Sequence, residues 1–340
     1  MNVISKMLGL KSKSLAADKS DKIGRALVFI YLALFFCFLV LPLFALMSKS
    51  MQNADGVFIG LENFAVYLKD PTLFKSFFHS LFVAFVSTVI VVCLGFLYAF
   101  ALQCTCIPFK GFFRVVSLIP LLSPSILAAI ALVYWFGNQG MFKELLFGNS
   151  IYGPIGIIMA SVYWTFPHAL MILSTSLSLS DARLYEASDA LKASKLRTFF
   201  TVTVPGAKYG IISTTFVVFI LVFTDFGVPK VIGGNYNVLA TDIYREVVGM
   251  QNFQMGAVIS IVLLVPALLA FAFDQFFRKR QAAQLTSRAV VYVPKPHKMR
   301  DNLLLCYCLL VTALVLLMLG MAQFGALVKF WPYDLSLTLK

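Results

Sequence analysis

Residues Tyr185 to Pro205 read YEASDALKASKLRTFFTVTVP and form a charged segment between two apolar stretches. In the whole chain of 340 residues, 60% are hydrophobic and 13% are charged, and the mean hydropathy is +0.88. Apolar residues make up roughly half of a soluble domain, so this composition excludes a soluble globular protein. The chain is predicted to be an integral membrane protein with a polar segment in its middle.

Seven stretches are apolar and long enough to cross a bilayer core, which needs roughly 20 residues of helix. They cover residues 26–47, 77–102, 115–136, 151–179, 209–226, 254–276 and 302–324. The first is longer than the apolar region of a cleaved signal and no small-residue cleavage site follows it, so it is expected to stay as an anchor. We therefore expect an all-α polytopic membrane protein with about seven transmembrane helices.

The basic residues predict which side of the membrane each loop occupies. With the N-terminus in the cytoplasm, 20 of the 28 Lys and Arg residues lie in the inner segments. The positive-inside rule favours this orientation and places the opening segment in the cytoplasm. The net charge of +13 then reflects topology and attraction to anionic membrane lipids, and no nucleic-acid partner is expected.

The opening segment has the pattern of an amphipathic helix. Asp181 is a candidate N-cap, and the β-branched run Thr201 to Val204, followed by Pro205-Gly206, is expected to end the helix before the next span. The predicted apolar face consists of Leu184, Ala187, Leu191, Leu196 and Phe199, and the opposite face of Glu186, Asp189, Lys192 and Lys195. A helix lying in the headgroup layer would favour a polar face almost without acids. The acids present here favour a surface that docks a protein.

A spacing in this segment resembles a known motif. Glu186, Ala187 and Ser188 are followed by Val202, Val204 and Pro205, which lie sixteen, eighteen and nineteen residues after the glutamate. This pattern resembles the EAA loop of permease subunits of binding-protein-dependent ABC importers. Where that family usually has Gly, six residues after the glutamate, this chain has Lys192, so the geometry of the turn is expected to differ.

The resemblance implies a fold, a location and a set of partners. The fold is the type I ABC importer permease core in a bacterial inner membrane, and the loop is a coupling helix that sits in a groove of a cytoplasmic ATPase dimer. The further partners are a periplasmic substrate-binding protein and a second permease half or subunit, with no enzyme activity and no cofactor in the permease itself. The sequence contains no P-loop motif of its own, which agrees with an energy source in a partner.

Candidate residues of the transport path lie within or beside the spans. His168, close to Trp164, is interpreted as a pore-lining group or as a neutral histidine bonded to a neighbouring helix, and the second interpretation is favoured. Asp225, in VFTDFGVPKVIGG, is expected to mark a helix break near the path, or to reach the outer water. Helix breaks are also expected at prolines within spans, which are Pro120, Pro124, Pro154, Pro167 and Pro266. The six cysteines are interpreted as small core residues, and no metal site is predicted.

Three stretches refine the resemblance, namely TDFGVPKVIGG, NVLATDIYREVVGMQNFQMGAV and LLVPALLAFAFDQF. They are similar to permeases for 2-aminoethylphosphonate uptake, in a wider group that includes iron(III) permeases, and the resemblance covers about residues 60 to 280. It implies import of 2-aminoethylphosphonate or a related phosphonate, whose ammonium group could meet Asp225 and whose anionic group could meet Lys230 or a helix N-terminus. The alternatives are iron(III) or another small solute, an ion-coupled secondary carrier, or a membrane-bound enzyme, which would need clustered His, Cys or acidic residues.

The expected organisation is a cytoplasmic segment (1–25), a first helix with a periplasmic loop (26–76), a permease core (77–277) with its coupling loop (181–205), a cytoplasmic linker (278–301) and a seventh helix (302–340). The exit sequence VKFWPYDLSLTLK is similar to LENFAVYLKD after the first span. A seventh span alone would have no partner within the chain. The hypothesis is that residues 302–340 begin a second permease half that is missing.

Overall fold

The computed structural model describes residues 19–284, 290 and 292–338, and most of them are helical. The helices in chain order are α2 (Lys19–Phe35), η1 (Phe36–Val40), α3 (Leu41–Ser50), α4 (Glu62–Lys69), α5 (Pro71–Cys104), α6 (Lys110–Leu118), η2 (Ile119–Leu122), α7 (Ser125–Phe136), η3 (Lys143–Leu146), α8 (Pro154–Ser178), α9 (Ala182–Ala190), α10 (Lys195–Thr198), η4 (Phe199–Thr203), α11 (Val204–Gly206), α12 (Lys208–Phe223), α13 (Gly227–Ile232), α14 (Leu239–Tyr244), η5 (Arg245–Gly249), α15 (Phe253–Gln284) and α16 (Lys298–Leu327). A short antiparallel hairpin of β1 (Val328–Phe330) and β2 (Asp334–Leu337) follows α16.

The membrane spans agree with the predicted number. Five helical stretches are long and apolar enough to cross a bilayer, and they are Ile23–Ser50, Pro71–Cys104, Pro154–Ser178, Phe253–Phe277 and Lys298–Leu327. Two further stretches meet the same criterion only as bent pairs, Lys110–Leu122 with Ser125–Phe136 at 101° and Lys195–Gly206 with Lys208–Phe223 at 64°. Counting each bent pair as one span gives seven, so the all-α polytopic architecture is confirmed.

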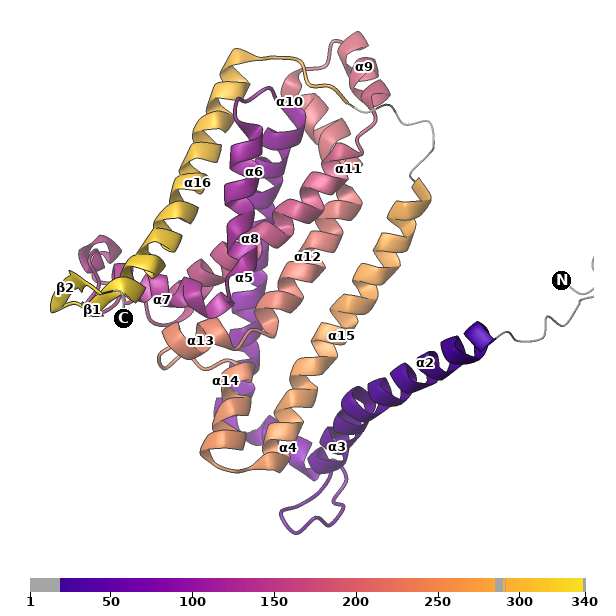
Figure 1. The fold of residues 1–340 in the computed structure, drawn as a ribbon, viewed down its shortest axis with the longest axis vertical. Helices are drawn as coiled ribbons and strands as arrows, with labels where there is room; N and C mark the ends of the chain where they lie inside the picture. Colours follow the sequence, from indigo (N-terminus) through magenta and orange to yellow (C-terminus); the bar gives the residue numbers. More distant parts are fainter. Residues whose placement is uncertain (1–18, 285–289, 291, 339–340) are drawn as a thin grey trace, which may run out of the picture.

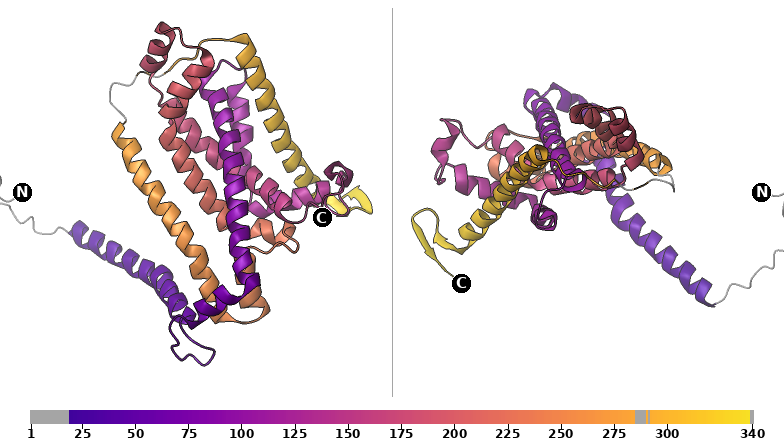
Figure 2. Two further views of the ribbon diagram at one scale, coloured as in Figure 1. Left: turned by 180° about the vertical axis from the view of Figure 1, so that it is seen from behind. Right: turned by 90° about the horizontal axis from the view of Figure 1, so that it is seen from above.

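The core of the bundle consists of α5, α8, α12 and α15 (Figures 1 and 2). Small residues allow these helices to approach closely, because a Cβ atom at Gly210 of α12 would lie 2.3 Å from the Cβ of Ser176 of α8. Gly95 of α5 lies against Ala169 of α8 in the same way. Helices in lipid associate through such close packing, since lipid tails are as apolar as the side chains themselves. These contacts therefore fix the centre of the fold.

The third predicted span, residues 115–136, is not one continuous helix. The chain becomes extended at Ser123 and Pro124, and α7 then leaves at 101° to the preceding helix. Proline has no N–H and disfavours helical geometry in the residue before it, so Pro124 ends the helix at Ser123, whereas Pro120 lies inside η2 with a helical residue before it. The other prolines act differently, because Pro154 begins α8 whereas Pro167 and Pro266 lie inside continuous helices.

The two ends of the bundle carry different elements (Figure 1). At one end lie α9 and α10 together with the beginning of α16, and at the other lie α4, α14 and the loop after α3. We refer to these as the α9 end and the α14 end. The charged segment that opened the sequence is thus displayed at one end of the bundle, as the alternation of spans predicted.

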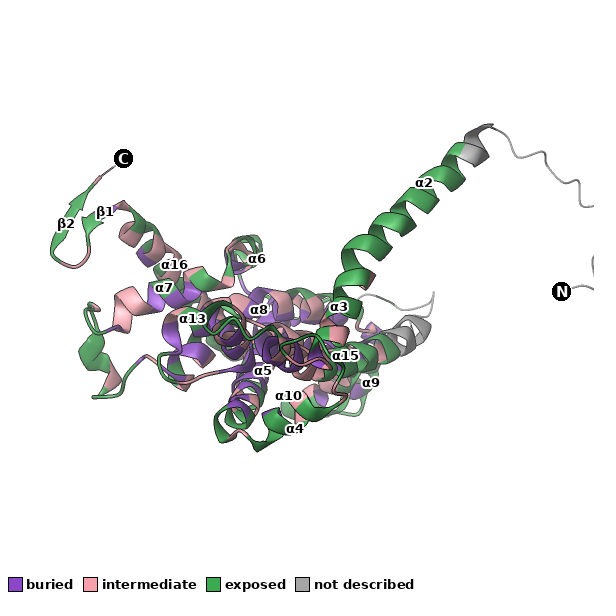
Figure 3. Cartoon of the chain, turned by 90° about the horizontal axis from the view of Figure 1, so that it is seen from below, coloured by how far each residue is buried: buried purple, intermediate pink, exposed green. Residues whose placement is uncertain are grey.

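The first and last spans differ in their contacts. The apolar window of Ile23–Ser50 has no buried residue, and Figure 3 shows α2 exposed along its length. In contrast, α16 packs against α5, α6 and α7. The hydroxyl of Tyr98 in α5 lies 3.0 Å from the hydroxyl of Thr312 in α16, and Tyr307 donates a hydrogen bond to the Leu94 carbonyl at 2.8 Å.

The expectation that the seventh span lacks a partner within the chain is therefore wrong. The two exit sequences also fold differently, because LENFAVYLKD contains the whole of α4 whereas residues 328–337 of VKFWPYDLSLTLK form the β1–β2 hairpin.

Candidate functional site

The predicted coupling loop forms a helix–turn–helix at the α9 end. The Asp181 carboxylate accepts a hydrogen bond from the Arg183 N–H at 3.1 Å and caps α9, as predicted. The helix ends at Ala190, and Lys192 adopts a left-handed conformation with φ of 50°. A new helix, α10, then starts after Ser194, whose side chain caps it. We call α9, this turn and α10 the coupling hairpin.

The conformation of Lys192 shows how the turn is made without the glycine that the family usually has at this position. The backbone keeps the left-handed geometry that glycine would permit, although the residue carries a Cβ atom. That conformation costs an L-residue roughly 1–2 kcal/mol. Because the chain turns here, the single apolar face predicted from Leu184 to Phe199 does not exist.

Hydroxyl groups, rather than leucines, face the bundle from the hairpin. Tyr185 and Ser188 are buried, and their hydroxyls contact those of Thr203 at 3.1 Å and Thr198 at 2.7 Å. Burial raises the pKa of Tyr185 to about 12, so its hydroxyl remains a donor at any physiological pH. The Tyr185 bond joins α9 to η4, which continues through α11 to α12, and the Ser188 bond joins α9 to α10. The hydroxyl residues Tyr185, Ser188, Thr198 and Thr203 were the sequence signal for this buried face, but the spacing of the apolar residues drew attention away from them.

The outer face of the hairpin combines charge with exposed leucines. Glu186 and Ala187 are exposed, and the side chains of Leu184, Leu191 and Leu196 are 54%, 82% and 74% exposed. Three leucines of the predicted apolar face therefore point away from the bundle, whereas Phe199 packs on Phe96 and Phe100 of α5. Large apolar side chains grouped in a polar surface are typical of a docking site.

The remaining predicted coupling residues lie where the fifth span bends. Val202 and Val204 are half-buried and Pro205 is exposed. The helical run ends with α11 at Gly206, as predicted for the β-branched residues followed by Pro205 and Gly206. The bend follows, at 64°, where α12 starts.

Asp225 lies at the break between α12 and α13, as the sequence predicted. One carboxylate oxygen accepts the Val228 N–H at 3.0 Å, and the other accepts the Ser125 hydroxyl at 2.8 Å. Ser125 is the first residue of α7 and directly follows the 101° break. Asp225 therefore joins two helix breaks that lie 100 residues apart in the sequence. Lys230, its suggested partner in binding a zwitterion, has its ammonium group 4.1 Å from the centre of the Tyr244 ring.

His168 and Trp164 lie one turn apart on α8, with their rings edge to face at 5.8 Å. Within the described residues, neither Nδ1 of His168 nor Nε1 of Trp164 has a hydrogen-bond partner. The Nδ1 atom of His168 therefore gives no support to the interpretation of a histidine bonded to a neighbouring helix. Both side chains are half-buried and keep polar atoms available.

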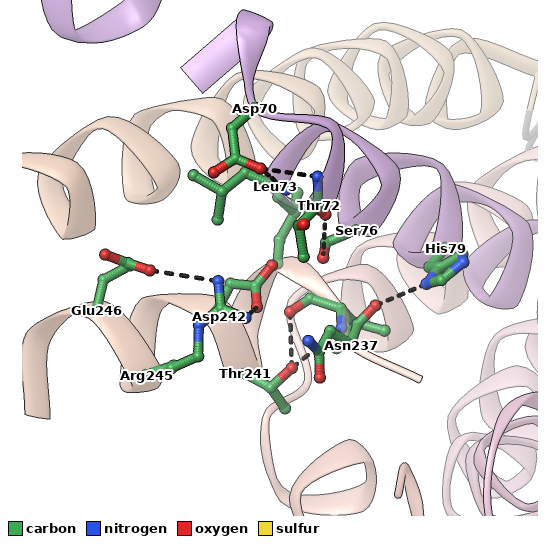
Figure 4. Close-up of polar contacts among 12 residues, drawn as sticks. Asp70, Thr72, Leu73, Ser76, His79, Asn237, Thr241, Asp242, Arg245 and Glu246 are labelled. Atoms are coloured by element: carbon green, nitrogen blue, oxygen red, sulfur yellow. Dashed lines mark hydrogen bonds and ion pairs between the residues drawn. The ribbon is translucent and has the colours of Figure 1, made fainter. Parts of the chain in front are cut away.

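A buried charged group at the α14 end was missed by sequence reasoning (Figure 4). Asp242 and Glu246 are 1% and 5% exposed, and Arg245 contacts their carboxylates at 3.4 and 3.3 Å. Burial raises the pKa of Asp242, because the charged form is costly away from water. Nearby, His79 of α5 shares a hydrogen bond with the Asn237 carbonyl at 2.9 Å. These contacts hold α14 against the start of α5.

Residues 108–282 match the family model of the binding-protein-dependent transport system inner membrane component. The chain belongs to this permease family. It is 31% identical over 275 residues to the ferric transport system permease protein FbpB of Actinobacillus pleuropneumoniae, covering 77% of this chain and 38% of that protein. It is 25% identical over 242 residues to the spermidine/putrescine transport system permease protein PotB of Escherichia coli, covering 67% and 88%.

A second ferric permease, the putative ferric transport system permease protein FbpB 1 of Haemophilus influenzae, is 28% identical and is covered to 42% of its length. The chain therefore spans about two fifths of the length of the ferric permeases that it matches. Among solved structures, a bacterial alginate ABC transporter in complex with its periplasmic protein has a TM-score of 0.58 at 14% identity, covering 80% of this chain and 98% of that chain. This likeness confirms the ABC permease fold.

Replacing Lys192 by glycine is expected to stabilise the coupling hairpin. Lys192→Gly removes a Cβ from a left-handed residue, which relieves about 1 kcal/mol of strain. Hydrogen exchange of the α9 amides in the membrane-inserted permease should slow. The matched control is Ala190→Gly in the helix itself, where glycine should speed exchange because it is a poor helix former. Equal or faster exchange in Lys192→Gly would show that the turn carries no strain.

Two substitutions of Asp225 separate a structural role from a role in transport. Asp225→Ala removes the acceptor of two hydrogen bonds and should lower thermal stability in detergent by about 1–3 kcal/mol. Asp225→Asn keeps one carbonyl acceptor and should lose less. If the charge serves the transported solute, Asp225→Asn abolishes uptake in a folded protein. Normal uptake by Asp225→Asn would instead limit this carboxylate to joining α7 and α13.

Proposed function

We propose that this chain is a permease subunit of an ATP-driven ABC importer, which forms part of the translocation path and takes its energy from a separate ATPase. The observation that carries the proposal is the coupling hairpin at the α9 end. Its inner face is hydrogen-bonded to η4 through Tyr185, and Ser188 joins its two helices, whereas its outer face exposes Glu186 among leucines. A surface built in this way can dock a partner and pass a displacement inward.

The energetics favour a protein partner for the outer face. Each leucine side chain that leaves water on docking contributes about 1.5–3 kcal/mol, and Leu191 and Leu196 are mostly exposed. Glu186 adds a charge whose pairing makes the contact specific, because a wrong partner would leave it unpaired. The bond from Tyr185 to Thr203 then connects the docked helix to the element that leads into α12.

The proposed partners are a cytoplasmic ATPase dimer, a periplasmic substrate-binding protein and a second permease half or subunit. The family itself is defined by its dependence on a binding protein. An ATPase dimer with two-fold symmetry offers two equivalent docking grooves. The described residues contain one hairpin of this kind, so a second permease half would supply the other. The exposed apolar surface of α2 is available to lipid or to that half.

The proposed location is a bacterial inner membrane, with the N-terminus and the α9 end in the cytoplasm. The support is the charge distribution along the sequence, in which the loop that forms the coupling hairpin and the segment before α16 are rich in Lys and Arg. The family description as an inner membrane component agrees with this location.

The proposed substrate is a small solute delivered by the binding protein. The relatives are named for ferric iron and for spermidine/putrescine, so the 2-aminoethylphosphonate prediction finds no support among them. Ferric iron was the alternative in the same resemblance, and a relative at 31% identity is named for it. Uptake into vesicles that contain the binding protein and ATPase encoded beside this chain, measured with each of the three solutes, identifies the substrate. Uptake that continues without ATP would favour an ion-coupled carrier instead.

Reversing the charge of Glu186 is expected to uncouple transport from ATP hydrolysis. Glu186→Lys should insert normally, because the side chain is exposed, but it should reduce the stimulation of ATPase activity at least tenfold through loss of the docking contact. Arg114→Glu is the matched control, since it reverses an exposed charge in α6, outside the hairpin and outside the segment that leads into α16. Full stimulation by Glu186→Lys would remove the hairpin from the ATPase contact.

The orientation is tested by enzyme reporters. A phosphatase fused near Gly140, in the loop after α7, should be active because it reaches the periplasm, and one fused near Lys195 should be inactive. The opposite pattern would place the coupling hairpin outside the cell, where no ATPase could meet it.

A further inference from the structure

The segment that leads into α16 lies against the coupling hairpin. We call residues 292–297 the strap. The ring of Tyr292 in the strap stacks on Tyr185 of α9, with centroids 4.0 Å apart and planes at 24°. Just before the strap, the Val290 carbonyl accepts a hydrogen bond from the Ala182 N–H, in the first turn of α9, at 2.9 Å. The strap therefore contacts α9 through both backbone and aromatic groups.

A charged bridge joins the strap to both helices of the hairpin. The Asp189 carboxylate of α9 accepts hydrogen bonds from Lys195 of α10 at 3.0 Å and from Lys295 of the strap at 3.1 Å. These bonds lower the pKa of Asp189, so the bridge is present at neutral pH. Exposed ion pairs contribute little by themselves, and the stacked tyrosines are the stronger contact.

A cavity of about 270 Å³ lies between the hairpin and the neighbouring end of α5, lined by Phe100 and Cys104 of α5 on one side and by Tyr185 and Tyr292 on the other. A gap of this kind removes part of the dispersion contacts between the two surfaces. Beside this cavity, α9 is held by the Tyr185–Thr203 hydrogen bond and by the strap.

The strap is also fixed to α16, so it can transmit a displacement. Arg300 of α16 donates a hydrogen bond to the Lys295 carbonyl at 2.9 Å, and the Asp301 carboxylate accepts the His297 N–H at 3.0 Å. Both bonds close the strap onto the first turn of α16. The thiol of Cys106 contacts the Pro294 carbonyl at 3.3 Å, which fixes the strap to the loop after α5.

At its other end α16 lies directly on the broken third span. A Cβ atom at Gly325 would lie 2.3 Å from the ring of Tyr134 in α7, so the two helices meet without space between them. The Trp331 ring, just beyond α16, lies 5.0 Å from the same tyrosine ring, and its indole N–H donates to the Gln139 carbonyl at 3.3 Å. A movement of α16 would reach α7 and the loop that follows it.

We propose that the strap is a second mechanical link from the coupling hairpin to the transport path, running through α16 to α7, and that Tyr292 and Lys295 are its positioning residues. This proposal rests on the proposed function, because the link has a purpose only if the hairpin is moved by an ATPase. It gives the seventh span a part in coupling, beyond anchoring the chain.

The test compares variants of one strap residue in two measurements. In the membrane-inserted chain without ATPase, Tyr292→Ala should speed hydrogen exchange of the α9 amides roughly two- to tenfold, because a stacked aromatic pair is lost. Tyr292→Phe keeps the stacked ring and should behave as the unmodified chain does. Val293→Ala is the matched control, since it changes the next residue of the strap, whose side chain is 77% exposed. In the assembled importer, Tyr292→Ala should also lower the amount of solute transported per ATP hydrolysed, and Lys295→Ala should do so more weakly.

Each outcome separates the link from the proposed function. Unchanged exchange in Tyr292→Ala overturns the contact between the strap and α9. Faster exchange with unaltered transport per ATP overturns the link, because the hairpin would then act without the strap. An unmodified chain that fails to stimulate any ATPase contradicts the proposed function instead, and the exchange measurement, which contains no ATPase, distinguishes that failure from a failure of the strap contact.

Discussion

The structure depends on the need to satisfy broken backbone inside a membrane. Helices are interrupted at Ser123–Pro124, within the third span, and between α12 and α13, at the end of the fifth. Each interruption removes helical hydrogen bonds that lipid cannot replace. The fold brings the two interruptions together and joins them through the Asp225 carboxylate, which accepts from Ser125 and from the Val228 N–H. A carboxylate suits this task because it has several acceptor positions and no proton to place. One acidic side chain thereby holds the ends of α7 and α13.

The spans and the location of the coupling segment could be predicted because hydrophobicity and charge determine both. The bend of the third span was expected from its prolines. Pro167 is also a proline within a span, yet α8 continues through it. The difference lies in the surroundings, since neighbouring helices can satisfy the carbonyl that an internal proline frees. Sequence alone gives no account of those neighbours. The charged group of Asp242, Arg245 and Glu246 could not be predicted for a similar reason. What distinguishes it from surface charges is its burial, which the sequence does not show.

The direction of the coupling hairpin could not be predicted from periodicity. Apolar residues on an amphipathic helix normally face the protein. Here Tyr185 and Ser188 are buried instead, and their hydroxyls pair with Thr203 and Thr198. In the proposed function, the exposed Leu184 and Leu191 would contact the ATPase. At Lys192 the left-handed turn is likewise kept, although this conformation is strained for a residue with a Cβ atom.

In the proposed mechanism, two connections from the hairpin converge on α7. The first runs through Tyr185 and Thr203 to α12, whose end is joined to the start of α7 by Asp225. The second runs through the strap to α16, which contacts α7 at Tyr134. Closely packed helices move as rigid units, because their cores compress little. A broken helix held at its start by one connection and along its length by another can change position only when both move together. The double attachment would therefore keep α7 still during chance motions of either connection and let it move when the whole hairpin is displaced.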